Sequence, residues 1–115
     1  MSDITIWHNP RCSKSRQTLA LLQEQGQEPT IVEYLKEAPS KTELLQALVK
    51  LEMSAHDLLR RGESVYKELG LSKDTGDKAL VTAMHENPIL IERPIVFANG
   101  KAAIGRPPEA VLEII

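Results

Sequence analysis

The order of short apolar segments near the N-terminus places the strongest constraint on the fold. Residues 4–7 (ITIW) have the alternation of a short strand, and residues 15–26 have leucines at helical spacing and end at a glycine. Residues 30–35 (TIVEYL) again have strand composition. A strand, a helix and a second strand in close succession favour a right-handed crossover between parallel strands. The sequence therefore predicts a β-α-β unit at the start of an α/β fold.

The middle of the chain is predicted to be helical. Ser40 and Glu43 have the spacing of a capping box ahead of an apolar stripe, and the pair Ser54 and Asp57 repeats that spacing. A further amphipathic segment over residues 77–88 ends at a proline. We therefore expect a block of helices over about residues 40–88.

Strand patterns return near the C-terminus. Residues 94–104 (PIVFANGKAAI) contain two apolar runs around Asn99-Gly100, which predicts a hairpin with a two-residue turn. Residues 106–115 (RPPEAVLEII) begin with prolines suited to a first helical turn and predict a short helix. The full order is β-α-β, a helical block, then β-β-α. Because no repeat or long linker interrupts it, we expect one domain over residues 1–115, with the helical block as an insertion.

Composition excludes several classes of function. Of the 115 residues, 42% are hydrophobic and 26% are charged, which is typical of a folded globular domain. A formal net charge of -2 supplies no overall field that would attract nucleic acid or an anionic membrane. The sequence has no signal-peptide pattern and no segment with the roughly 20 apolar residues of a membrane span. We therefore expect a cytoplasmic protein that binds neither nucleic acid nor membrane.

The single cysteine lies where the first predicted strand passes into the first predicted helix, in the segment HNPRCSKS. The amide groups and dipole at the start of a helix stabilise a thiolate and also bind oxyanions. His8 and Arg11 are candidate cations, and the Ser15 hydroxyl is a candidate donor to the sulfur. Because its neighbours are polar or loop-forming, we interpret Cys12 as a reactive thiol rather than a buried apolar residue. A metal site at His8 and Cys12 needs further ligands, so no metal is predicted.

Five segments occur in a specific order over nearly the whole chain: ITIWHNPRCSKSRQTL, EPTIVEYL, LLRRG, NPILIERPIV and GRPPEAVLEII. Together they resemble the arsenate reductase family that works with glutathione and glutaredoxin, which is a branch of the thioredoxin-like fold. The resemblance implies a thioredoxin-like mixed sheet that carries the helical block as an insertion.

The resemblance also implies a set of site residues. The cysteine of the family's H-N-P-x-C motif attacks arsenate and corresponds to Cys12, while His8 and Ser15 match family positions thought to tune the thiol. The family's oxyanion-binding arginines correspond to Arg60, Arg93 and Arg106. Arginine suits this task because its planar fork donates paired hydrogen bonds to a tetrahedral oxyanion and keeps its charge. The implied site requires these three guanidinium groups to meet at Cys12.

Two spacings separate this chain from related proteins. Arsenate reductases that resemble small tyrosine phosphatases need an arginine six residues after the cysteine, where this chain has Thr18. Transcription regulators of the same fold family typically carry a C-x-x-C pair, whose second position is Ser15 here.

Pro94 follows Arg93 at the entry to a predicted strand, where thioredoxin-like folds place a cis-proline; the sequence is compatible with cis and trans.

The resemblance implies an oxidoreductase that converts arsenate to arsenite, with glutathione as cosubstrate, glutaredoxin as partner and no bound cofactor. External thiols are required because the chain has no second cysteine. The chain ends at Ile115, soon after GRPPE, whereas well-established reductases of this type continue for a further segment. Two alternatives therefore stay open. One is a monothiol redox enzyme of the same fold that acts on glutathionylated or oxidised thiols without reducing arsenate; the other is a non-catalytic protein that binds a partner.

Overall fold

The structure of the protein, a computed structural model, describes residues 4–115. These residues group into two compact units. The first unit contains the described residues up to Glu37 together with Arg93–Ile115, and the second is Ala38–Glu92. The second unit includes the segment predicted to be a helical insertion, while the organisation of residues 1–115 as one domain stays a prediction.

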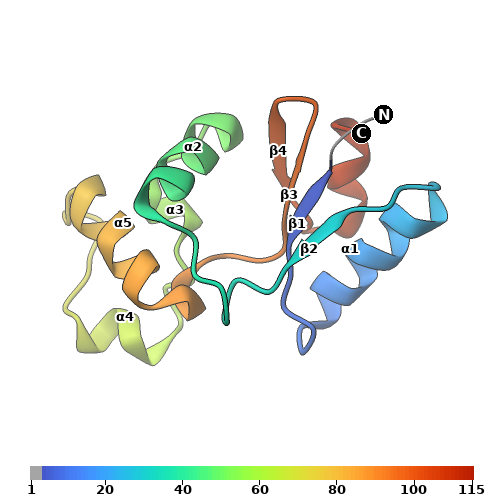
Figure 1. The fold of residues 1–115 in the computed structure, drawn as a ribbon. Helices are drawn as coiled ribbons and strands as arrows, with labels where there is room; N and C mark the ends of the chain where they lie inside the picture. Colours follow the sequence, from blue (N-terminus) through green and yellow to red (C-terminus); the bar gives the residue numbers. More distant parts are fainter. Residues whose placement is uncertain (1–3) are drawn as a thin grey trace. The chain divides into compact units, whose positions relative to one another are not determined.

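A four-stranded mixed sheet in the order β2-β1-β3-β4 forms the centre of the first unit (Figure 1). Its strands are β1 (Thr5–Trp7), β2 (Thr30–Val32), β3 (Ile95–Ala98) and β4 (Lys101–Ile104). Strand β1 is parallel to β2, whereas β3 is antiparallel to both β1 and β4. The mixed α/β class and the parallel pairing of the first two strands are therefore confirmed. Strand β2 is shorter than the prediction for residues 30–35, because the chain turns after Val32.

Helix α1 (Ser13–Glu24) connects the two parallel strands and begins two residues earlier than predicted. Its buried residues are Ser15, Thr18 and Leu22, which share one face because three- and four-residue steps return to the same side of a helix. Two of these three residues are polar, so the leucine pattern alone did not reveal the face that α1 buries.

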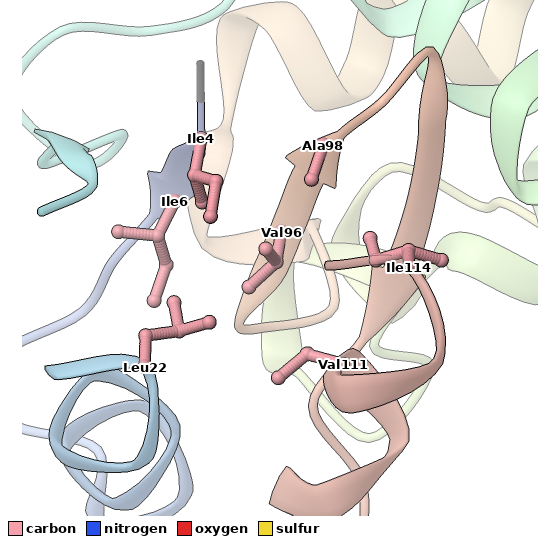
Figure 2. Close-up of a cluster of buried hydrophobic side chains, with 7 residues drawn as sticks. All are labelled: Ile4, Ile6, Leu22, Val96, Ala98, Val111 and Ile114. Carbon is pink, nitrogen blue, oxygen red and sulfur yellow. The ribbon is translucent and has the colours of Figure 1, made fainter. Parts of the chain in front are cut away.

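The core of the first unit lies between the sheet and two helical segments, α1 and the 3-10 helix η2 (Pro108–Glu113). Figure 2 shows aliphatic side chains from β1 and β3 facing Leu22 of α1 and Val111 of η2. The cluster consists of Ile4, Ile6, Leu22, Val96, Ala98, Val111 and Ile114. Full burial of an aliphatic side chain contributes about 1.5–3 kcal/mol, so this cluster fixes α1 against the sheet.

The turn between β3 and β4 is the predicted two-residue hairpin. Asn99 has φ 54° and Gly100 has φ 74°, and two successive positive values are what a type I′ turn requires. The Asn99 side chain also donates a hydrogen bond to the Ile114 carbonyl at 2.7 Å. This bond ties the hairpin to the end of the chain.

The second unit is helical, as predicted. It contains α2 (Lys41–Leu51), α3 (Ala55–Leu58), α4 (Ser64–Glu68), α5 (Asp77–Glu86) and the 3-10 helix η1 (Pro88–Leu90). The predicted capping box is present, since Ser40 Oγ accepts from the Glu43 amide at 3.0 Å and Glu43 Oε1 accepts from the Ser40 amide at 2.9 Å. The sequence did not predict α4, which has no apolar stripe and buries none of its five residues.

A helix that crosses a membrane needs a long apolar segment. Among the described residues, no helix combines the length and the apolar composition needed to cross a bilayer.

Candidate active site

Cys12 lies at the N-cap of α1, at the end of the loop that follows β1. The loop turns where the Cys12 amide donates to the Asn9 carbonyl at 3.0 Å, and the Cys12 carbonyl accepts the first helical bond, from Arg16, at 3.0 Å. Cys12 itself is extended, with φ -94° and ψ 124°, as an N-cap residue is expected to be. Its exposed fraction is 9%, so the thiol is more buried than its polar sequence neighbours suggest.

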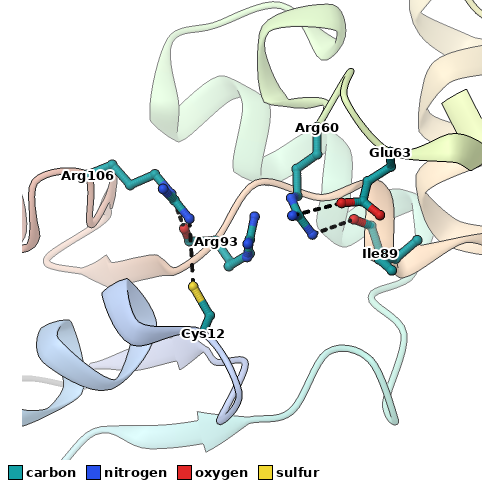
Figure 3. Close-up of polar contacts among 6 residues, drawn as sticks. All are labelled: Cys12, Arg60, Glu63, Ile89, Arg93 and Arg106. Carbon is teal, nitrogen blue, oxygen red and sulfur yellow. Dashed lines mark hydrogen bonds and ion pairs between the residues drawn. The ribbon is translucent and has the colours of Figure 1, made fainter.

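The sulfur of Cys12 lies against a guanidinium group. Figure 3 shows Arg106 reaching toward Cys12, with Arg106 Nη2 donating to Sγ at 3.7 Å. Burial raises the pKa of the Cys12 thiol, but the backbone N–H groups of Ser15 and Lys14 together with two positive charges outweigh it. The charges belong to Arg93 and Arg106, and the result is a pKa of Cys12 below its ordinary value. The start of α1 therefore stabilises the thiolate more than an ordinary cysteine environment does.

The β3–β4 hairpin brings the segments of Arg93 and Arg106 together. Ile95 pairs with Ile104 across the hairpin, so the residues just before β3 lie beside those just after β4. Arg106 Nε donates to the Arg93 carbonyl at 2.8 Å. The Arg93-Pro94 peptide bond is cis, which answers the question that the sequence left open, and Arg106-Pro107 is cis as well.

His8 and Ser15 form a buried polar pair behind the loop. His8 Nδ1 lies 2.6 Å from Ser15 Oγ, which also accepts from the Asn9 amide at 3.0 Å. Burial lowers the pKa of His8; the charge of Glu33 opposes this shift and that of Arg16 adds to it. The neutral imidazole is therefore favoured over the cation that the sequence suggested.

Two details of the expected thiol environment differ in the structure. The Ser15 hydroxyl, expected to donate to the sulfur, bonds with His8 and Asn9, and it is the Ser15 backbone N–H that lowers the pKa of Cys12. Arg11 is exposed, and the charges that lower this pKa come from the two arginines at the ends of the hairpin. A buried hydroxyl needs a fixed partner, and His8 supplies one within the loop.

Arg60 belongs to the second unit, where it follows α3. Arg60 Nη2 lies 2.8 Å from Glu63 Oε2, and Nη1 donates to the Ile89 carbonyl at 3.4 Å (Figure 3). Its neighbour Arg61 contacts His56, with Nη1 at 3.3 Å from Nδ1. The contribution of Arg60 to a site at Cys12 stays a prediction.

Gly105, directly before Arg106, was not identified from the sequence. A Cβ added at Gly105 would overlap Thr18 Oγ1 and lie 2.8 Å from Pro94 Cγ, so α1 and the start of β3 both pack against this glycine. The available signal was a glycine next to a predicted site arginine. In the sequence, Thr18 is distinguished only as a position that lacks an arginine.

The arrangement in the first unit allows nucleophilic chemistry on an anion. A thiolate with a lowered pKa is a good nucleophile, and adjacent guanidinium and amide groups attract the oxygens of a negatively charged substrate. Within residues 4–115, no group of three or more His, Cys, Asp or Glu side chains is arranged to hold a metal ion.

Comparison with known proteins gives consistent matches over the whole length of the chain. The profile of the ArsC family matches residues 7–114. The chain is 55% identical over 115 residues to a protein of Escherichia coli K12 described as uncharacterized protein YfgD, covering 97% of this chain and 96% of that protein. It is 47% identical over 117 residues to an arsenate reductase of Neisseria meningitidis, with 100% of both chains covered. The solved structure of an arsenate reductase from Vibrio cholerae superposes with a TM-score of 0.95 at 50% identity, covering 98% of each chain.

Proposed function

Because the chain belongs to the ArsC family, with its thioredoxin-like fold, we propose that it reduces arsenate to arsenite and that Cys12 is the nucleophile. The observation that carries this proposal is the contact of Cys12 Sγ with the Arg106 guanidinium at 3.7 Å, at the start of a helix. The lowered pKa of the thiol supports the same role, since only the thiolate attacks efficiently.

In the first step, the Cys12 thiolate attacks the arsenic of a bound arsenate. A sulfur–arsenic bond forms, one arsenic–oxygen bond breaks, and the released oxygen takes up protons and leaves as water. Arsenic stays in its +5 state throughout this step. We assign the binding of the remaining oxygens to Arg93 and Arg106, to Arg60, and to amide groups at the start of α1.

Reduction then requires two thiols from outside the chain, because Cys12 is its single cysteine. The thiol of glutathione replaces a second oxygen on arsenic, which again leaves as water. A glutaredoxin thiolate attacks the glutathione sulfur, so that a mixed disulfide forms and the electron pair of the sulfur–arsenic bond stays on arsenic. Arsenic is thereby reduced from +5 to +3. Water releases arsenite and returns the Cys12 thiol.

His8 and Ser15 are proposed to tune the thiol by holding the loop that precedes it. Their 2.6 Å contact, together with the bond from the Asn9 amide to Ser15 Oγ, links both ends of the segment that carries Cys12. We also propose that the protein works in the cytoplasm, where external thiols are kept reduced.

Replacement of the nucleophile is the most direct test, and it carries the largest expected effect. Cys12→Ser should abolish glutathione- and glutaredoxin-dependent arsenate reduction while the variant keeps its fold and still binds arsenate. Gln17→Ala, at an exposed position on the same helix, is the matched control and should retain activity. Coupled arsenate reduction by Cys12→Ser would refute the assignment.

The role of Arg60 can be tested against its neighbour. Arg60→Lys keeps the charge but loses the fork, so we expect the KM for arsenate to rise by about tenfold, or about 1.4 kcal/mol. Arg61→Lys makes the same change one residue along the chain, where the side chain contacts His56, and should leave KM unchanged. Equal KM values for Arg60→Lys and the wild type would remove Arg60 from the site.

The same measurements distinguish the alternatives. A wild-type protein with a lowered thiol pKa but no arsenate turnover would support a monothiol enzyme that acts on glutathionylated or oxidised thiols. An ordinary thiol pKa together with no turnover would support a non-catalytic binding protein.

A further inference from the structure

Gly105 occupies a position where the space for a side chain is already filled. An added Cβ would overlap Thr18 Oγ1, lie 2.8 Å from Pro94 Cγ and lie 3.0 Å from Thr18 Cγ2. Among residues 4–115, Gly105 is not one of the residues with a positive φ, unlike Gly100. Gly105 is therefore required for close approach rather than for backbone freedom.

Neither neighbour of Gly105 can easily move away. Thr18 is fully buried and β-branched, and its Oγ1 donates to the Lys14 carbonyl at 2.8 Å. The ring of Pro94 is buried and rigid, and the Pro94 carbonyl accepts from the Gly105 amide at 3.0 Å. The end of β4 is thus held between α1 and the segment that enters β3.

This contact is linked to the thiol by the next residue in the chain. Arg106 donates through Nε to the Arg93 carbonyl at 2.8 Å and through Nη2 to Cys12 Sγ at 3.7 Å. Cys12 and Thr18 belong to one continuous helical segment and are separated by about 9 Å along its axis, at 1.5 Å per residue. The same rigid element therefore carries both the sulfur and the surface against which Gly105 packs.

We propose that Thr18 and Gly105 are positioning residues, whose close contact sets where the Arg106 guanidinium lies relative to the Cys12 sulfur. This inference rests on the proposed function in one respect, namely that Cys12 acts as a thiolate. It gives a role to Thr18, the position at which the tyrosine-phosphatase-like reductases have an arginine. Here the residue acts through its shape and burial rather than through charge.

The test measures the Cys12 thiol directly, as the pH dependence of its alkylation by iodoacetamide. Gly105→Ala should displace Arg106 and raise the pKa by about one unit, which lowers the alkylation rate about tenfold at a pH below that pKa. Arg106→Ala removes the guanidinium group and should give the largest rise in the pKa of Cys12. Gly76→Ala is the matched control, because among residues 4–115 a Cβ at Gly76 would meet no heavy atom within 4 Å beyond Gly76 and its two chain neighbours. Its profile should match the wild type.

A second substitution separates positioning from general destabilisation. Thr18→Ala removes Oγ1 and Cγ2, the two Thr18 atoms nearest to an added Cβ, and alone should raise the thiol pKa by a smaller amount because the contact is loosened. In the double variant Gly105→Ala/Thr18→Ala, the space created should relieve the overlap of the new methyl group with Thr18, while its contact with Pro94 Cγ remains. The pKa should therefore fall back toward the wild-type value, whereas independent destabilising effects would add.

Two results would overturn the inference. One is an unchanged pKa in Gly105→Ala; the other is a double variant whose pKa shift equals or exceeds the sum of the two single shifts. If Gly105→Ala does not fold, Thr18→Ala decides the question, since an unchanged pKa in that variant contradicts a positioning role. Melting temperatures of all variants show which of them are folded during the assay.

The alkylation assay contains no arsenate, glutathione or glutaredoxin, so the inference and the proposed function can fail separately. The expected alkylation pattern without arsenate turnover would contradict the function and support the positioning role. Arsenate turnover with a wild-type thiol pKa in Gly105→Ala would overturn the positioning role alone.

Discussion

Helices α1 and α2 have nearly the same length, 12 and 11 residues, but they begin in different ways. Helix α2 begins at Ser40 with a complete capping box, a feature that stabilises a helix by about 1 kcal/mol. Helix α1 begins at Cys12, whose side chain makes no capping hydrogen bond in the described chain. Its first-turn N–H groups, from Lys14 and Ser15, instead lower the pKa of the thiol. One helix start favours stability, and the other favours a reactive sulfur.

The charges in the two first turns differ in the same sense. The first turn of α2 contains Glu43, whereas that of α1 contains no acidic residue. A carboxylate near the N-terminus favours a helix through its dipole, but it would also disfavour a neighbouring thiolate. The absence of acidic residues from the first turn of α1 therefore avoids a charge that would disfavour the Cys12 thiolate.

The largest effect on this comparison is expected from removing the cap of α2. Ser40→Ala leaves the Glu43 amide without its acceptor, so the free energy of unfolding should fall by about 1 kcal/mol, with Tm lower by several degrees. The iodoacetamide profile of Cys12 should not change. A shift in the thiol pKa of Ser40→Ala would mean that the two helix starts are not independent.

A smaller effect is expected from giving α1 the acid that α2 has. In Lys14→Glu, a carboxylate at about 6 Å in a water-like dielectric costs the thiolate about 0.7 kcal/mol, or about half a pKa unit. The alkylation rate of Cys12 at a pH below its pKa should then fall about threefold. Lys14→Gln is the control, because the group of Lys14 that acts on the thiol is its backbone N–H, and it should behave as the wild type. Identical rates for the Glu and Gln variants would contradict this account.

The smallest expected effect is that of low pH, which should destabilise the loop before α1. Because burial lowers the pKa of His8, the unfolded chain binds a proton before the folded protein does. The contribution to stability is complete above the unfolded value of about 6.5 and is lost as pH falls below it toward the folded pKa. Chemical denaturation of the wild type and of His8→Gln between pH 7 and 5 measures the contribution of His8 to the free energy of unfolding. Parallel curves of unfolding free energy against pH for the two proteins would contradict this contribution.

Local signals in the sequence were sufficient for much of the fold. The capping box at Ser40, the turn at Asn99-Gly100 and the parallel pairing of the first two strands each depend on residues close together in the chain, and the structure confirms all three. Helix α4 was missed because it buries none of its residues and has no apolar period to detect. The C-terminal helix was predicted, although its 3-10 geometry over Pro108–Glu113 was not.

The sequence predicted a list of candidate site residues, whose roles stay predictions, but not their arrangement in space. The position of Cys12 before a helix follows from the period change around it, and the structure brings Arg93 and Arg106 to the same region of the first unit. The polar buried face of α1 and the packing of Gly105 against Thr18 depend on tertiary contacts between distant segments. The apolar periodicity of a sequence does not report such contacts, because Ser15 and Thr18 are polar and Gly105 has no side chain.

The tight turn at Asn99-Gly100 has a consequence at the opposite end of the strands it joins. Side chains of a strand alternate between its faces, so a slip of one residue between β3 and β4 would reverse the direction of every side chain on the slipped strand. The partner of Ile95 would no longer be Ile104, and the backbone carbonyl that receives Arg106 would face a different neighbour. A one-residue insertion in this turn should therefore disturb the contact between Arg106 and the Cys12 sulfur, although the turn is several residues away from Arg106 in the sequence.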